Sequence, residues 1–312
     1  MGDFASVVWD IFTSEATYTI GALFAALLLF GAAGELVAER AGTINISVEG
    51  MLLAGAFGGA VGFDLTDSVA VGVLFGIGGG MAVASVQAEM SHRLAADQFV
   101  VGLTLNILVL GLVGFLDHEL APVAHKAAAW RVPLFADLPL VGEALFGQPW
   151  PFYLVYLCVP VTWWLLFRTR WGLEVRSSGE DPRSADLSGI DVNKRRRQSI
   201  YLTGLMSGLG GAFLLFAQVG VFDDGMVGGR GFIAIAAVIF GGWTLKGTIA
   251  GSVLFASALS FRLSLQAQGY EGINSELLQA LPFLLTIAGM AIFAKRVRPP
   301  AALARPFIRG LK

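Results

Sequence analysis

The sequence predicts an all-α, polytopic helical membrane protein, and three observations support this fold class. Of the 312 residues, 55% are hydrophobic and only 14% are charged, whereas soluble domains carry about 25% charged residues. The apolar residues form long blocks, such as TIGALFAALLLFGAAG at 19–34. These blocks recur along the chain, and a block of about 20 apolar residues is long enough to cross the hydrocarbon core as a helix.

The apolar blocks define about nine transmembrane segments within one domain covering 1–312, each judged against the length needed to span a bilayer. The chain contains a single cysteine, Cys158, inside an apolar block. A disulfide framework and a cysteine metal site are therefore excluded. We expect the spans at 18–36, 47–63, 68–90, 97–116, 152–168, 198–219, 231–242, 247–265 and 276–294.

The distribution of basic residues predicts the orientation, because Lys and Arg concentrate on the cytoplasmic side of a membrane protein. When the loop 169–197 is placed inside, most of the 21 Lys and Arg residues fall on that side. The N-terminus then lies outside and the C-terminus inside. The same alternation makes 117–151 an extracytoplasmic loop.

Two of the expected spans are interrupted. The segment 231–242 is too short to cross the bilayer as a helix, and GGWTLKG follows it. The segment 42–63 starts with Gly and Asn and carries Glu49 where the hydrocarbon core should begin. Broken helices are tolerated where they face protein or a water-filled cavity, and a pair of them indicates a transport pathway. The alternative is two ordinary helices with frayed ends.

Small residues recur at four-residue spacing within several spans. Such faces let helix backbones approach closely in lipid. They predict close helix packing and no particular function. The positions are Gly55 and Gly59; Gly72, Gly76 and Gly80; Gly204 and Gly208; and Gly247 and Gly251.

The polar stretch GEDPRSADLSGI at 179–190 predicts a helix of two turns at most in the cytoplasmic loop. Asp181 suits the N-cap position and Pro182 the first turn. Gly189 suits the left-handed residue that ends a helix. So short a helix must be held by packing. It serves either to dock on a soluble partner or as a turn without a function of its own.

A resemblance favours the docking interpretation. EDPRSADLSGIDV at 180–192 resembles the cytoplasmic segment of ABC-importer permeases of the branched-chain amino acid, ribose and nucleoside group. Further stretches resemble that family in the same order along the chain. They are GELVAERAGTINISVEGMLLAGA (34–56), ADQFVVGLTLNIL (96–108), GMVGGRGFIAIAAVIFGGWTLKGTIAG (225–251) and LLQALPFLLTIAGM (277–290).

The resemblance implies a multi-pass permease subunit in the cytoplasmic (inner) cell membrane, without an ATPase site of its own. In this family the segment forms a coupling helix that sits on a separate ABC ATPase subunit, which consumes the ATP. The positions concerned are Glu180, Asp181, Pro182, Arg183, Ala185, Asp186 and Gly189.

The resemblance also implies two further protein partners and a substrate class. The chain is most similar to the shorter permease of nucleoside importers of the basic-membrane-protein type, which pairs with a longer sister chain; a homodimer fits as well. An extracytoplasmic binding protein would deliver nucleosides, or else simple sugars, with branched-chain amino acids a weaker option. The stretch 117–151 follows no family pattern and is a candidate docking site for that binding protein.

Candidate residues of the translocation path lie in the interrupted segments and one neighbouring span. Asn45, Glu49 and Asn106 place polar groups at membrane depth, where such groups face a cavity or a partner. Glu49 either meets a ribose hydroxyl or pairs with a backbone N–H or Arg40. Arg230 either caps the external mouth or anchors at the interface. Phe232 and Phe240 either stack on a nucleobase or pack in the bundle.

Several other functions are disfavoured. No G-x-x-x-x-G-K-[ST] phosphate loop occurs, so we expect no ATP or other cofactor on this chain. The three His residues lie apart, which predicts no metal site. The basic run KRRR at 194–197 adjoins a span, where it sets topology and meets anionic headgroups, so we expect no nucleic acid partner.

Two alternatives to an ATP-driven importer subunit remain open. An ATP-independent secondary transporter would place carboxylates near the midplane, but Glu35 and Glu49 lie near the expected cytoplasmic ends. A membrane enzyme would need a convergent set of catalytic groups, and the sequence presents none.

Overall fold

The computed structural model describes residues 4–268, 280, 284, 287–288 and 298–308. Within that part of the chain every regular element is a helix, and seven helices are long and apolar enough to span a membrane. They are α2 (Glu15–Arg40), α3 (Val48–Thr66), α4 (Val69–His92), α5 (Gln98–Leu120), α7 (Trp150–Arg168), α10 (Val192–Phe213) with its short π-helical continuation η1 (Leu214–Val219), and α12 (Leu245–Ala267).

These seven helices coincide with seven of the nine expected spans. The expected interruption within 42–63 is confined to the non-helical residues before α3, and α3 itself is a continuous helix that is long enough to span a membrane. The eighth expected span is the short helix α11 (Arg230–Phe240), which confirms that this segment does not cross the bundle as one full-length helix. The ninth, at 276–294, falls almost wholly outside the described residues, as does the 277–290 motif. The remaining helices are α1 (Phe4–Thr13), α6 (Gly142–Phe146), α8 (Arg170–Glu180) and α9 (Pro182–Leu187).

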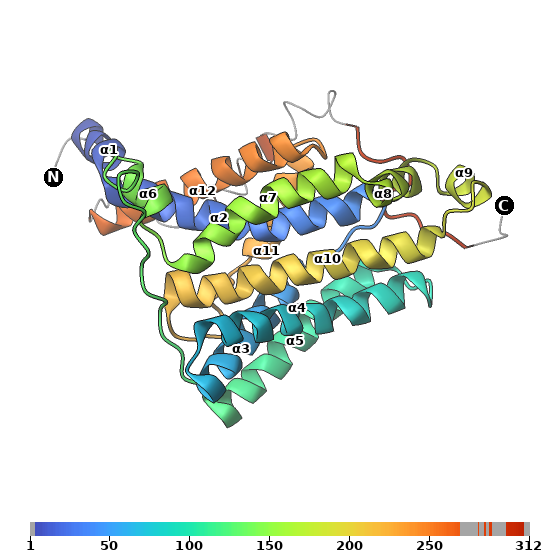
Figure 1. Cartoon of the computed structure of the whole chain (residues 1–312), viewed down its shortest axis with the longest axis horizontal. Coiled ribbons are helices and arrows are strands. Elements are labelled where there is room, and N and C mark those ends of the chain that lie inside the picture. Colours follow the sequence, from blue (N-terminus) through green and yellow to red (C-terminus); the bar gives the residue numbers. More distant parts are fainter. Residues whose placement is uncertain (1–3, 269–279, 281–283, 285–286, 289–297, 309–312) are drawn as a thin grey trace.

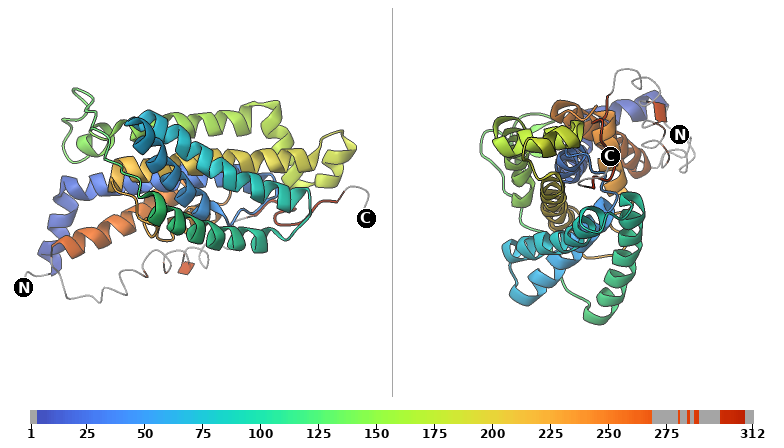
Figure 2. Two further views of the ribbon diagram at one scale, coloured as in Figure 1. Left: turned by 90° about the horizontal axis from the view of Figure 1, so that it is seen from below. Right: turned by 90° about the vertical axis from the view of Figure 1, so that its right-hand side faces the viewer.

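The helices lie roughly along one axis and fall into two groups. Figure 1 shows α2, α7 and α12 on one side and α3, α4 and α5 on the other, with α10 and α11 between them. The end-on view in Figure 2 shows the same division. The helix α10 contacts α2, α3 and α4, and α11 contacts α2, α3 and α12. The two central helices therefore join the two groups.

The α3–α4–α10 crossing is made possible by glycines. A Cβ on Gly208 would lie 2.5 Å from the carbonyl oxygen of Gly76, and one on Gly76 would lie 2.7 Å from the carbonyl oxygen of Gly55. Both separations are too short for any side chain, so the three backbones are in direct contact. The predicted small-residue faces thus pack helices against one another, as such faces do in lipid.

The two ends of the bundle carry different elements. In Figure 1, the N-terminus, α1 and α6 lie at one end, and α8, α9 and the C-terminus lie at the other. We refer to these as the α1 end and the α9 end. The expected loop 169–197 is mostly helical, because α8 precedes α9 and α10 begins at Val192, before the expected start of that span.

Candidate functional site

The chain leaves helical geometry between α2 and α3, and we call residues 41–47 the break segment. Its backbone groups are bonded by side chains from the surrounding helices. The amide of Ile44 donates to Gln98 Oε1 over 3.0 Å, and the amide of Asn45 donates to Glu35 Oε1 over 2.9 Å. Thr43 Oγ1 lies 2.9 Å from His92 Nε2. Protein groups thus supply the hydrogen bonds that this buried, non-helical backbone would otherwise lack.

Asn45 and Asn106 both stabilise the start of α3. The Asn45 Oδ1 atom accepts from the amide and hydroxyl of Ser47, at 3.1 and 2.6 Å. Asn106, on α5, donates through Nδ2 to the Ile46 carbonyl over 2.9 Å and accepts from the Gly50 amide over 2.8 Å. One side-chain amide therefore bridges the last residues of the break segment and the first turn of α3.

Glu49 binds the N-terminus of α11. Its Oε1 accepts from the amide of Gly229 over 2.7 Å and its Oε2 from the amide of Gly231 over 2.6 Å. The first amides of a helix have no intrahelical acceptor, and the helix dipole favours an anion there. Among the alternatives for Glu49, the structure shows the pairing with backbone N–H groups. The two interrupted segments therefore meet at this carboxylate.

The other candidate path residues divide between the two ends of α11. Arg230 lies at its start, where Nη1 donates to the Met226 carbonyl over 2.8 Å and the guanidinium lies 4.9 Å from the ring centroid of Phe24. Phe232 is 40% exposed in the isolated chain. Phe240 lies at the opposite end, with its ring centroid 5.8 Å from that of Phe255, so it is separated from Glu49 by the length of the helix.

Two buried carboxylates near the break segment were not among the residues predicted for the translocation path. Glu35 and Glu39 lie one turn apart on α2 and are fully or almost fully buried. Glu39 accepts a short hydrogen bond from Trp243 Nε1, at the turn between α11 and α12. Their other oxygens, Glu35 Oε2 and Glu39 Oε1, have no hydrogen-bond partner among the described residues. In the sequence, GELVAER reads as the polar end of a span, and no spacing rule indicates that these carboxylates point inward.

The predicted short helix at 179–190 is present as α9, with the expected caps. Asp181 Oδ1 accepts from the amides of Arg183 and Ser184, each over 3.1 Å, and Pro182 occupies the first turn. The Ser184 hydroxyl and these amides hold the pKa of the Asp181 carboxyl below its usual range. Gly189 follows the helix with a left-handed φ of +85°.

Four of the seven candidate coupling residues on and beside α9 are exposed: Glu180, Asp181, Arg183 and Gly189. Pro182 and Asp186 are half-buried. Leu187 is 89% exposed. Ala185 is buried and packs inward. The helix thus presents an apolar tip and charged sides beyond the end of the bundle.

The α9 region is connected to the end of α2. Arg40 Nη1 forms an ion pair with Glu180 Oε1 at 3.8 Å, and Arg40 Nε donates to the Trp243 carbonyl over 2.8 Å. Arg40 therefore pairs with Glu180 and not with Glu49. A Cβ on Gly179 would lie 2.9 Å from the amide nitrogen of Gly42, so the backbone before α9 touches the break segment.

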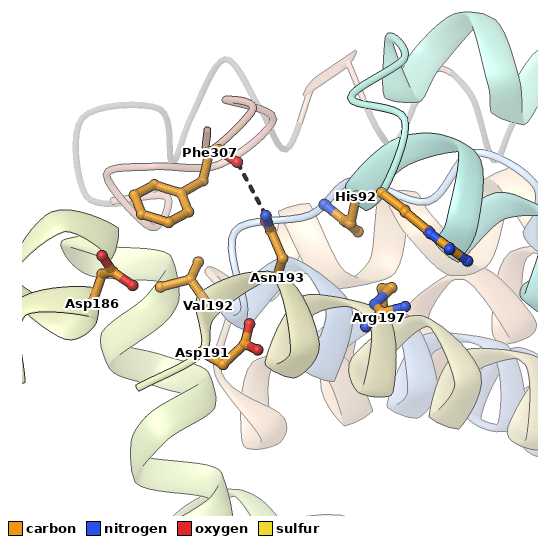
Figure 3. A pocket seen from close by; sticks show the side chains of 8 residues that line it. His92, Asp186, Asp191, Val192, Asn193, Arg197 and Phe307 are labelled. Atoms are coloured by element: carbon orange, nitrogen blue, oxygen red, sulfur yellow. Dashed lines mark hydrogen bonds between the residues drawn. The ribbon is translucent and has the colours of Figure 1, made fainter. Parts of the chain in front are cut away.

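A polar cavity of about 460 Å³ lies beside α9, between α10 and the end of α4. Figure 3 shows Asp186 and Asp191 on one side of it and His92 and Arg197 on the other. Phe307, from the C-terminal segment, lies near Asp186, and its carbonyl accepts from Asn193 Nδ2 over 3.3 Å. Two carboxylates therefore lie on one side of this cavity, and the guanidinium of Arg197 lies on the other.

We expected the basic run 194–197 to meet lipid headgroups, but its three arginines contact protein instead. It forms the first turns of α10, and its three arginines turn to protein partners. Arg195 pairs with Glu174 on α8, and Arg197 pairs with Glu89 on α4 at 2.8 Å. Arg196 is completely buried. The reason is the helical period, which points three successive side chains toward three different neighbours.

Comparison with known proteins decides the family. The sequence profile of the family described as "Branched-chain amino acid transport system / permease component" matches residues 17–290. The chain belongs to this family. It is a multi-pass integral protein of the cell membrane, consistent with the seven apolar helices.

Curated relatives match over most of their length. The nucleoside ABC transporter permease protein NupC of Lactococcus lactis is 33% identical over 92% of this chain and 95% of that protein. The guanosine ABC transporter permease protein NupQ of Bacillus subtilis is 30% identical over the same shares. The fructose import permease protein FrcC of Rhizobium meliloti is 27% identical over 83% of this chain and 73% of that protein. The chain is thus an ABC transporter permease component, and an ATP-independent carrier is not favoured.

Proposed function

We propose that this permease component forms the membrane path of an ATP-driven importer for nucleosides or simple sugars. The names of the similar permeases, which include nucleoside, guanosine and fructose transporters, support this substrate class. ATP hydrolysis is assigned to a separate ATPase subunit. The observation that carries the proposal is the direct contact between the end of α8, which leads into α9, and the segment that follows α2, through the Arg40–Glu180 pair and the contact of Gly179 with Gly42.

In this proposal the α9 end faces the cytoplasm and the α1 end faces outward. The exposed tip of α9, with Leu187 and the charged residues beside it, docks on the ATPase. Movement of α9 then displaces the end of α2 and the break segment. Because the break segment is not helical, it changes shape at a lower cost in backbone hydrogen bonds than a continuous helix would.

The proposed path passes the place where the interrupted segments meet. Glu49 joins α3 to α11, and Asn106 joins the break segment to α5. A displacement of the break segment therefore changes the spacing of α3, α5 and α11. Phe232 is exposed beside this junction and would face the solute or a second permease subunit, either a longer sister chain or another copy of this one.

At the opposite end, the loop 117–151 is the proposed docking surface for an extracytoplasmic binding protein. The loop is ordered by its own contacts: the Trp130 amide donates to the Gln148 carbonyl over 2.9 Å, and Arg131 pairs with Glu143 at 3.1 Å. Leu134 is 85% exposed and Phe135 is 54% exposed. Exposed apolar side chains in an ordered loop are typical of a surface that is covered by a partner.

The coupling role is tested in proteoliposomes that contain the permease, its ATPase and its binding protein. We expect Asp181→Ala and Arg183→Glu to reduce substrate-stimulated ATP hydrolysis to the unstimulated level while membrane insertion stays normal. The control is Glu15→Ala, which removes an exposed carboxylate at the start of α2, outside every proposed docking surface. Uptake that continues without the ATPase subunit would contradict the proposal and favour a carrier.

The substrate class is tested by competition for uptake. Labelled guanosine is imported in the presence of unlabelled uridine, ribose, fructose or leucine. We expect nucleosides to compete most strongly and leucine least. If leucine competes and the nucleosides do not, the proposed substrate class is wrong, although the coupling role stands.

A further inference from the structure

The C-terminal segment Pro300–Ile308 lies across the base of α9, and we call it the C-terminal strap. It makes backbone hydrogen bonds with two separate parts of the chain. The Ala302 amide donates to the Gly179 carbonyl over 2.9 Å, and the Ala304 amide donates to the Gly42 carbonyl over 3.1 Å. Gly179 lies just before α9, and Gly42 lies in the break segment. The strap therefore bonds both the end of α8, which leads into α9, and the break segment, which is proposed to move.

A buried arginine on α10 holds the same three segments together. Arg196 Nε donates to the Ala41 carbonyl over 3.1 Å, and Nη1 donates to the Arg305 carbonyl over 2.7 Å. Nη2 makes longer contacts with the carbonyls of Ser178, at 3.5 Å, and Ala302, at 3.4 Å. The guanidinium thus bonds the break segment, the end of α8 and the strap at once.

The environment of Arg196 indicates why an arginine occupies this position. Its side chain is completely buried, and no carboxylate lies within ion-pair distance of it in the described part of the chain. A buried charge is costly unless its donors are satisfied. Only a guanidinium offers a planar set of five N–H donors to several carbonyls. Lysine would keep the charge but could not reach all of these acceptors.

The break segment and the end of α8 are in backbone contact at Gly42 and Gly179, too close for one to slide past the other. Gly42 has a left-handed φ of +88°, and a Cβ there would lie 2.7 Å from Arg196 Nη2 and 3.1 Å from Gly179 Cα. Segments in such contact move together or lose their hydrogen bonds together. A displacement of α9 relative to the bundle is therefore shared with Gly42.

We propose that the C-terminal strap, pinned by Arg196, holds Gly179 against Gly42 and so lets movement of α9 reach the break segment. This inference rests on the proposed function of α9 and adds two elements to it. The strap acts as a transmitting element and not as the ATPase docking surface. Arg196 is a positioning residue, since it acts through the segments it holds.

The test uses the assembled transporter with two changes to the permease. A stop after Pro299 removes the strap, and its matched control is a stop after Ile308, which leaves the strap in place. Arg196→Lys keeps the charge but replaces the planar set of five donors by a single ammonium group. Its matched control is Lys194→Met, an exposed position in the same turn of α10. Co-purification of the ATPase subunit checks docking in every variant.

We expect the strap deletion and Arg196→Lys to retain the ATPase subunit and its basal hydrolysis. The ratio of solute imported to ATP hydrolysed should fall about tenfold, which is an ordinary size for a lost coupling between sites. The two control variants should keep the ratio of the unmodified transporter. An unchanged ratio in both test variants, or loss of the ATPase subunit from the strap deletion, would overturn the proposal.

A second measurement, independent of transport, follows amide hydrogen exchange when nucleotide is added. In the unmodified transporter, exchange should change in α9 and in residues 41–47. In Arg196→Lys it should change in α9 alone. If the break segment still responds in Arg196→Lys, the strap is not the link. If α9 itself does not respond in the unmodified transporter, the proposed coupling function fails.

Discussion

The carboxylate of Glu49 offers the most direct test of how the two interrupted helices are joined. It accepts two backbone hydrogen bonds, from Gly229 over 2.7 Å and from Gly231 over 2.6 Å. Glu49→Gln keeps the shape of the side chain but removes the charge and turns one acceptor into an N–H₂ group. One helix amide then keeps a neutral acceptor, and the other faces a donor.

The size of the effect follows from this exchange. A hydrogen bond to a charged group contributes about 1.5–3 kcal/mol, and a neutral one contributes about 0.5–1.5 kcal/mol. Two charge-assisted bonds are replaced by one neutral bond, so we expect Glu49→Gln to lower the free energy of unfolding by about 2–4 kcal/mol. Glu49→Asp should cost a similar amount, because the shorter side chain cannot reach both amides.

The assay is reversible unfolding of the purified permease in mixed micelles, followed by circular dichroism. Glu15→Gln serves as the control, since it removes a carboxylate at the exposed start of α2. We expect the control to stay within about 0.5 kcal/mol of the unmodified protein, as surface substitutions do. If Glu49→Gln also stays within that range, Glu49 does not stabilise α11, and the junction described here is wrong.

Three further predictions concern packing, a buried acid and the α9 cap. Gly208→Ala should destabilise the fold by about 1–3 kcal/mol through overpacking, because its Cβ would lie 2.5 Å from a carbonyl oxygen of α4. The control is Gly78→Ala in the same unfolding assay. It should have no effect, because a Cβ at Gly78 would meet open space. Trp243→Phe removes the donor to buried Glu39 and should cost about 1–3 kcal/mol, and adding Glu39→Met should recover most of that loss. The pKa of Asp181 is lowered in the folded state, so its cap is complete above the ordinary aspartate range and is lost as pH falls through the lowered value. Hydrogen exchange in the first turn of α9 should therefore quicken only in acid, and Asp181→Ala should show fast exchange at every pH.

Local sequence patterns correctly predicted the helices and caps that depend on interactions within a short stretch of chain. The apolar blocks predicted seven helices that the structure contains, because the length of a span is set by the bilayer. The shortness of the segment 231–242 predicted α11. The Asp181, Pro182 and Gly189 positions predicted the caps of α9, since a cap depends on hydrogen bonds within a few residues.

Local sequence patterns could not predict the contacts between segments that are far apart in the chain. Glu49 and Gly229 are 180 residues apart, and no spacing rule connects them. Arg196 was read as part of a surface cluster, although it is buried against three backbone segments. Glu35 and Glu39 resembled the polar end of a span and yet point into the protein.

The sequence by itself determined the fold class, the short helix α11, the capped helix near the end of the bundle and the family resemblance. These follow from hydrophobic length, turn chemistry and ordered motifs, which act within short stretches of chain. Only the tertiary structure decided which polar side chains bond the interrupted segments and how α9 connects to them. The reason is that a buried donor or acceptor must find its partner in space, and that partner is chosen by helix packing and not by sequence distance.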